Sequence, residues 1–198
     1  MKTLSAIKYF GALAMSLVMG FALVGCDDDK SEIKPSEPLE NEFDRVECTI
    51  DIIPASDMRT FADMSGASYT NFSGEDVALG VATVDKQTVI FKCSEDKFPK
   101  TANVKFVATP KENVNMQEGK NYNLGHTIKI TAAVYSKDNT VLAVGSQDFS
   151  KVSAIDSETN YAKLLQARYP QILKVNVDKS GEEYVFTFEG GEKFDVAP

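Results

Sequence analysis

Apolar and polar residues alternate along most of the chain after residue 44, with the two-residue period of half-buried β-strands. In the clearest case, residues 126–135, the side chains of Ile128, Ile130 and Val134 fall on one face. The same alternation predicts further strands at residues 46–52, 76–84, 87–93, 103–109, 140–149, 172–177 and 183–189. Turn-forming residues at 85–86, 136–139 and 178–182 would join neighbouring strands as hairpins.

One segment departs from this pattern. In residues 157–169, apolar side chains recur at helical spacing. Asp156 or Ser157 would cap the start of this helix, and Pro170 would end it. The pattern therefore predicts one short amphipathic helix that covers an edge or end of a sheet, a structural role that is preferred to recognition of a partner.

About eight or nine short strands with one helix favour a mostly-β fold, a two-layer antiparallel β-sandwich of immunoglobulin-like or Greek-key type. A lipocalin-like barrel would show similar alternation. The long loop-like stretches at residues 54–75 and 110–125 fit a sandwich better than an up-and-down barrel.

The start of the chain has another pattern. Residues 9–25 carry no charge and are mostly apolar, and Lys2 and Lys8 precede them, which is the layout of a secretory signal peptide. A transmembrane anchor is the alternative interpretation. The run is at or below the lower limit for a spanning helix, which needs roughly 20 apolar residues, and acidic rather than basic residues follow it.

The apolar run closes with Leu23-Val24-Gly25-Cys26, which resembles the lipobox of bacterial lipoproteins. The resemblance implies cleavage after Gly25, a diacylglycerol thioether on Cys26 and a fatty acid on the new α-amino group. Each buried methylene group contributes about 0.8 kcal/mol, so three acyl chains would hold the protein durably at a membrane. The alternative is an ordinary cysteine that happens to end an apolar run.

Asp27, Asp28 and Asp29 follow the cysteine directly. They look like the acidic signal that directs some Gram-negative lipoproteins to the outer surface, which implies a surface-exposed protein of the bacterial outer membrane. A periplasm-facing protein with a solvated, charged linker is the alternative.

The sequence thus predicts three parts: a cleaved signal peptide (residues 1–25), a lipidated cysteine with a flexible tether (26–43) and one β-rich domain (44–198). Residues 27–43 contain seven acidic residues, two lysines and two prolines, which leaves little to bury. Extended like polyproline, this tether would reach roughly 50 Å.

Charge narrows the range of partners. Residues 1–25 contain two lysines and no acidic residue, so their removal leaves 19 basic and 29 acidic side chains and a net charge of −10. Such a chain has no charge attraction for nucleic acid or for an anionic membrane surface. Contact with a membrane is predicted only through the acyl chains on Cys26.

Cys48 and Cys93 lie on the more apolar side of two predicted strands. In an exported protein they could form a disulfide bond. They could equally remain buried thiols, because a domain of this size does not need a covalent link for stability. The sequence favours free thiols slightly and leaves the disulfide as a candidate.

No catalytic residue, metal site or cofactor is predicted. His126 is the one histidine of the chain, and no motif surrounds it, so a structural role is expected. A zinc site would need more ligands than His126, Cys48 and Cys93 provide. Paired carboxylates of a carbohydrate-active enzyme are not excluded by composition, but an enzyme is the third choice.

Residues 64–76 mix Ser, Gly and Asn with two aromatic residues, a composition typical of adaptable contact loops. Tyr69 and Phe72 would be its aromatic anchors. The simpler expectation is that both rings fold back onto the core.

These observations predict a non-enzymatic surface lipoprotein whose sandwich contacts a protein, matrix or glycan partner, with strand addition to a neighbour as a variant. The second hypothesis is an accessory protein with an internal, Phe- and Tyr-lined pocket for a small ligand.

Overall fold

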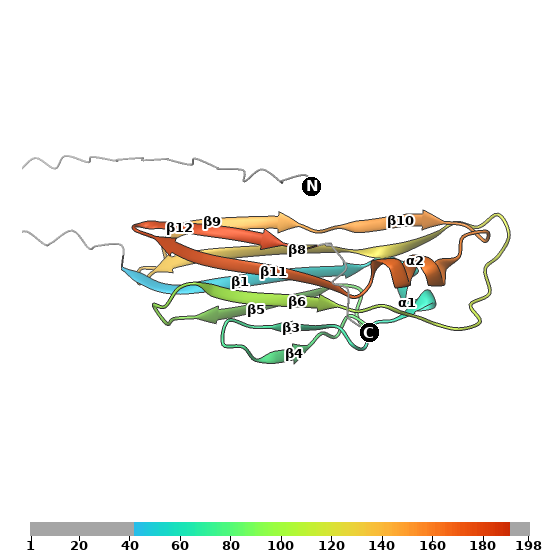
Figure 1. The fold of residues 1–198 in the computed structure, drawn as a ribbon, viewed down its shortest axis with the longest axis horizontal. Helices are drawn as coiled ribbons and strands as arrows, with labels where there is room; N and C mark the ends of the chain where they lie inside the picture. Colours follow the sequence, from blue (N-terminus) through green and yellow to red (C-terminus); the bar gives the residue numbers. More distant parts are fainter. Residues whose placement is uncertain (1–41, 191–198) are drawn as a thin grey trace, which may run out of the picture. The chain divides into compact units, whose positions relative to one another are not determined.

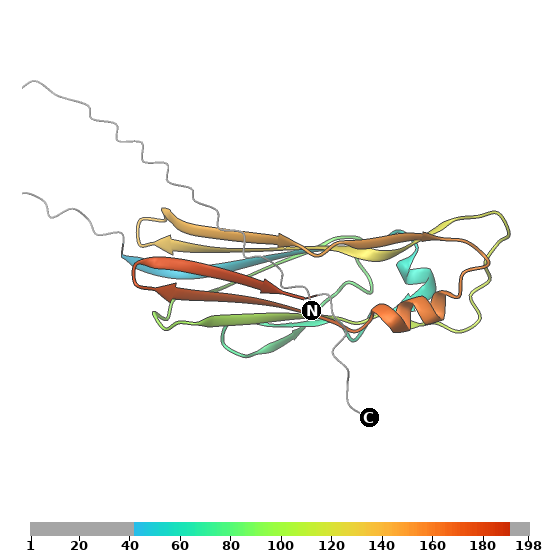
Figure 2. The same cartoon turned by 45° about the horizontal axis from the view of Figure 1, so that its top comes forward.

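Alternation of inward and outward side chains builds two antiparallel sheets that pack face to face in the computed structural model (Figures 1 and 2). The structure describes residues 42–190. The mostly-β, two-layer fold predicted from the sequence is confirmed.

The first sheet has the order β10-β8-β1-β5, and β9 also pairs with β8. Its strands are β1 (Phe43–Pro54), β5 (Gln87–Cys93), β8 (Tyr122–Ser136), β9 (Val141–Asp148) and β10 (Lys151–Ile155). β9 pairs with residues 129–135 of β8, and β10 pairs with residues 122–126. The two short strands therefore form one interrupted edge along β8, and β1 lies between β8 and β5.

The second sheet has the order β12-β11-β6-β3-β4. Its strands are β3 (Ser68–Thr70), β4 (Asp76–Ala78), β6 (Lys100–Phe106), β11 (Gln171–Ser180) and β12 (Glu183–Glu189). A separate pair joins β2 (Ala62–Asp63) to β7 (Thr109–Pro110). The chain crosses from one sheet to the other between β1 and β3, between β4 and β5, between β5 and β6, between β6 and β8, and between β10 and β11, unlike an up-and-down barrel.

The core lies between the sheets because each central strand turns one face inward. In β1 the inward side chains Val46, Cys48, Ile50 and Ile52 are buried, and in β8 Ile128, Ile130 and Val134 are buried. The second sheet contributes Ala102, Val104 and Phe106 from β6 and Leu173, Val175 and Val177 from β11. Burial of these apolar side chains is the main force that holds the layers together.

The predicted helix is α2 (Tyr161–Arg168), and it ends before Pro170 as expected. Its N-cap is Asn160, whose side chain accepts a hydrogen bond from the Lys163 amide at 3.0 Å. The predicted caps are wrong, because the Asp156 carboxylate instead accepts hydrogen bonds within the turn that precedes the helix. A second, one-turn helix that the pattern did not predict, α1 (Met58–Phe61), lies in the stretch expected to be a loop.

The hairpin predicted from residues 76–84 and 87–93 is wrong, because β4 and β5 belong to different sheets. The strand ends at Ala78, and the chain that follows is not extended. Leu79 and Val81 are nevertheless buried, since they fill the core from the connecting loop. The buried side chains of this loop therefore give the same alternation of apolar and polar residues as a strand, although they belong to no strand.

Candidate functional site

One end of the sandwich gathers the start of β1, the loop 94–99 between β5 and β6, the turn 137–140 between β8 and β9, and the turn between β11 and β12 (Figures 1 and 2). We call it the proximal end, because it is where the chain enters the domain. β1 begins at Phe43, which the sequence assigned to the tether. Glu42 is also attached: its carboxylate pairs with Lys137, and its carbonyl accepts the Lys137 amide at 3.0 Å.

Aromatic rings connect the two sheets at the proximal end. The rings of Phe43 and Phe98 meet edge to face with centroids 5.6 Å apart, and Phe98 lies 5.6 Å from Tyr184. The Lys179 ammonium lies 5.5 Å from the centroid of the Tyr184 ring. This row fixes the first residue of β1 against β12 of the opposite sheet.

A cleft of about 410 Å³ opens beside these rings. It is lined by Glu42, Phe43, Ser94, Asp96, Lys137, Lys179 and Tyr184. Charged and polar groups dominate this lining, and the cleft is open to solvent, so it differs from the internal aromatic pocket that the second hypothesis requires. The Glu42 carboxylate is occupied by its pairing with Lys137.

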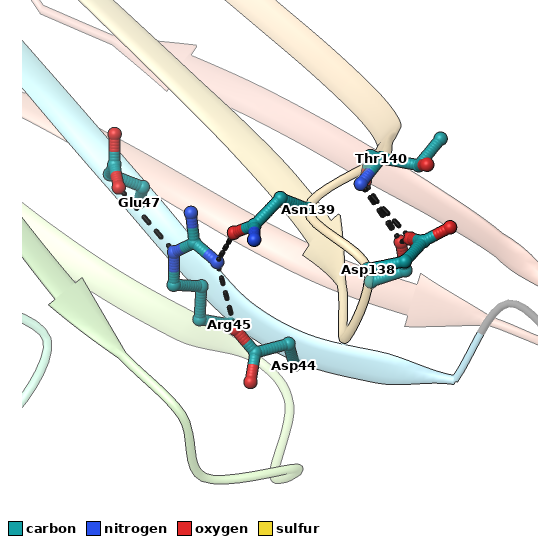
Figure 3. Close-up of polar contacts among 7 residues, drawn as sticks. Asp44, Arg45, Glu47, Asp138, Asn139 and Thr140 are labelled. Carbon is teal, nitrogen blue, oxygen red and sulfur yellow. Dashed lines mark hydrogen bonds and ion pairs between the residues drawn. The ribbon is translucent and has the colours of Figure 1, made fainter.

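Arg45 ties β1 to the neighbouring turn at the same end (Figure 3). Its Nη1 donates to Asp44 Oδ2 at 2.8 Å and to Asn139 Oδ1 at 3.0 Å, and its Nε lies 3.5 Å from Glu47 Oε2. Its guanidinium carbon lies 4.3 Å from the centroid of the Tyr135 ring. These contacts span β1, β8 and the turn between β8 and β9.

The turn itself is closed by Asp138. Its carboxylate accepts the Thr140 amide at 3.1 Å (Figure 3) and also accepts the Ser136 hydroxyl. These hydrogen bonds, the one from Ser136 first, lower the pKa of Asp138. The proximal end is thus a set of loops and strand ends held together by polar contacts and by the row of aromatic rings.

The two predicted cysteine positions lie on adjacent strands but not opposite each other. Cys48 pairs with Phe91 in the register of β1 and β5, and Cys93 pairs with Val46. Both thiols are free. Cys48 is fully buried, and burial raises its pKa to about 12, whereas Cys93 is half-buried at the proximal end.

Cys93 has a neighbour that the sequence analysis missed. The ammonium nitrogen of Lys100 lies 3.2 Å from Cys93 Sγ. Lys100 has the same strand parity as Ala102, Val104 and Phe106, so it points inward and is only 5% exposed. The alternation of residues along β6 therefore indicates that Lys100 points inward, but lysine side chains are normally expected to face solvent.

Tyr69 and Phe72 both pack on the ring of Phe91. Tyr69 stacks on it with centroids 5.3 Å apart, and Phe72 meets it edge to face at 5.1 Å. Both rings are half-buried against the core. The loop therefore folds back, and these rings serve packing of β3 and the following turn on β5.

His126 is fully buried near the end of the sandwich opposite the proximal end. Its Nδ1 lies 2.8 Å from the hydroxyl of Tyr169, and its ring packs 4.7 Å from that of Phe106. Nε2 has no hydrogen-bond partner among the described residues, and neither has Oε1 of the buried Gln171. The histidine expected to be structural thus lies inside the core, away from the proximal cleft.

Acid is expected to destabilise the domain through His126. Burial, helped by the charge of Lys151, lowers the pKa of His126 from 6.5 to about 4. The unfolded chain therefore binds this proton first as the pH falls below 6.5, and stability is lost until the pH reaches the folded pKa. Urea unfolding should show a loss of about 2 kcal/mol between pH 7 and pH 5. His126→Asn, which cannot titrate, should remove most of this decline, and an unchanged pH profile would contradict the assignment.

Cys26 and the three aspartates that follow it lie outside the described residues. Within residues 42–190, no helix is long and apolar enough to cross a membrane. No group of three or more His, Cys, Asp or Glu side chains within that same range could hold a metal ion. No known family model, curated protein or solved structure matches the chain.

Proposed function

We propose that this chain is a lipid-anchored, surface-exposed lipoprotein of the bacterial outer membrane whose β-sandwich has a non-enzymatic binding or structural role. The observation that carries the proposal is the order of segments: an uncharged apolar run, Leu23-Val24-Gly25-Cys26, three aspartates, an acidic stretch and then a folded domain. Each segment has the composition that its place in a lipoprotein requires.

The direction of β1 supports a binding role at the end of the domain opposite the tether. Because the chain enters at Phe43, the proximal end is the end joined to residues 27–41. The opposite end carries α1, α2 and the start of β8 (Figure 1). A tether from Cys26 would therefore leave that opposite end available to a protein, matrix or glycan partner.

The position of His126 supports a non-enzymatic role. A general base must reach the proton that it removes. The imidazole is fully buried, is held by the Tyr169 hydroxyl and has a pKa near 4, so it is neither exposed nor tuned for such chemistry.

The proximal cleft is the observation behind a second candidate, an accessory protein that binds a small ligand in this open, polar site rather than in an internal aromatic pocket. Its volume of about 410 Å³ is in the range of small-molecule sites. Its charged lining and its position next to the tether make it less suited to an apolar ligand. We therefore place this function after the contact role.

Protease treatment of intact cells tests the proposed location. In the wild type, the signal from residues 44–198 on a blot should disappear, because the domain lies outside. Replacing Asp27, Asp28 and Asp29 with asparagine should protect the domain by keeping it on the inner face. Permeabilised cells, in which both forms should be digested, are the control. A wild-type domain that resists digestion in intact cells but not in permeabilised cells would contradict surface exposure.

A further inference from the structure

A buried cation lies between the two sheets at the proximal end. Lys100, the first residue of β6, is only 5% exposed. Buried lysines are rare because removing an ammonium group from water is costly unless it is paired. The partners of Lys100 Nζ are Cys93 Sγ at 3.2 Å and Glu95 Oε2 at 3.9 Å, and Glu95 is 74% exposed. The sulfur atom is therefore its nearest partner.

Cys93 is placed so that a small oxidant can reach it. It is the last residue of β5 and is half-buried rather than enclosed. The next residue, Ser94, lines the open proximal cleft. A positive charge beside an accessible sulfur is the setting in which cysteines react with peroxide.

Cys48 provides the contrast within the same core. It is fully buried, and burial raises its pKa to about 12, so its thiol is inert. It is also not opposite Cys93 in the register of β1 and β5. Lys100, rather than Cys48, is therefore the group placed to react with an oxidised Cys93.

We propose that Cys93 and Lys100 form a redox modification site in which hydrogen peroxide drives formation of an S–N bond between them. In the first step the Cys93 sulfur attacks one peroxide oxygen, the O–O bond breaks, and the products are a sulfenic acid and water. Sulfur loses two electrons and the peroxide gains them.

In the second step the Lys100 ammonium gives one proton to water, and its neutral Nζ, which now has a free electron pair, attacks the same sulfur atom. The S–O bond breaks, and the hydroxide leaves as water with a second proton from the lysine nitrogen. Counted from the thiol and the neutral amine, the pair loses two hydrogen atoms over both steps, and one peroxide becomes two waters. Two equivalents of an external thiol would reverse the change by returning the thiol and the amine and forming a disulfide.

The product would be a covalent link between the last residue of β5 in the first sheet and the first residue of β6 in the second. It would also protect Cys93, because the captured sulfur cannot be oxidised further to the irreversible sulfinic acid. This inference is independent of the lipid anchor, since it rests only on residues 93–100 and their contacts.

Peptide mass mapping tests the proposal on the full chain purified in detergent. The protein is treated with hydrogen peroxide, unfolded, blocked at its remaining thiols and digested with trypsin. We expect the Cys93 and Lys100 peptides to appear as one linked species that is two hydrogens lighter than their sum. Treatment with dithiothreitol should separate them.

Three variants complete the design. Cys48→Ser should retain the linked species, whereas Cys93→Ser should lose it. Lys100→Met should also lose it and accumulate sulfinic acid at Cys93, and its unfolding curve would verify that it folds. An unmodified Cys93, a Cys48–Cys93 disulfide, or a link that contains an extra oxygen atom would overturn the proposal.

Discussion

Replacing Cys26 with alanine is expected to reduce fatty-acid incorporation into the chain to background. The proposed attachment needs the sulfur atom of this residue, and the proposed cleavage after Gly25 would create the amino group for the further acyl chain. At about 0.8 kcal/mol for each buried methylene group, the acyl chains would provide the proposed membrane affinity. Growth with an alkyne-labelled fatty acid, followed by coupling to a dye and gel electrophoresis, measures the effect.

The chain supplies matched controls for this experiment. Cys48→Ala and Cys93→Ala remove the other two cysteines and should be labelled like the wild type. Cys26→Ala should also migrate as the longer, unprocessed chain, because the cleavage that the lipobox resemblance implies lies at the bond before this cysteine. Labelling of the Cys26→Ala protein, or a wild-type chain whose mass still includes residues 1–25, would rule out the proposed anchor.

Replacing Gly125 with alanine is expected to cost about 4 kcal/mol or more in the free energy of unfolding. Gly125 has φ of +128° in β8, and a Cβ atom built there would lie 1.7 Å from the carbonyl oxygen of Lys151. That oxygen belongs to the strand β10, which pairs with β8 at this point. The clash can be relieved only by separating these strands, and Gly125 also accepts the Ala55 amide at 2.9 Å. Urea unfolding followed by circular dichroism measures the loss.

Gly181 is the matched control. It also has positive φ, +64°, but a Cβ atom there would meet no heavy atom within 4 Å. Gly181→Ala should therefore cost only about 1 kcal/mol, the penalty of the backbone conformation alone. Equal losses for the two variants would show that the close approach of Lys151 does not matter. If Gly125→Ala is insoluble, solubility of Gly181→Ala would assign the defect to the clash.

Alternation along the sequence was sufficient to locate most strands. β12 (residues 183–189) matches its predicted range, and β8 exceeds its own by only a few residues. Alternation reports which side of a strand is buried, however, and not which strand lies beside it. The pairing of β5 with β1 rather than with the segment 76–84 depends on contacts between distant residues, which no local pattern contains.

Most contacts of the candidate site could not be predicted from the sequence, for a similar reason. Cys93 and Lys100 are close in the chain, but the rule that lysine faces solvent concealed their contact. His126 and Tyr169 meet through β8 and the end of α2, and nothing in either neighbourhood indicates the other. The lipobox-like segment at residues 23–26, by contrast, is a local pattern that can be recognised without knowledge of the fold.

The place of β1 in the first sheet has a mechanical consequence. β1 follows directly on the proposed tether and is hydrogen-bonded on both sides, to β5 and to β8. Antiparallel hydrogen bonds run perpendicular to the strands. If a partner held the opposite end of the domain, tension along the proposed tether would act parallel to β1. The hydrogen bonds between β1 and its two neighbouring strands would then be loaded in shear and would share the force, instead of breaking one after another. The strand joined to the proposed anchor is thus well placed to resist being drawn out when the cell is pulled.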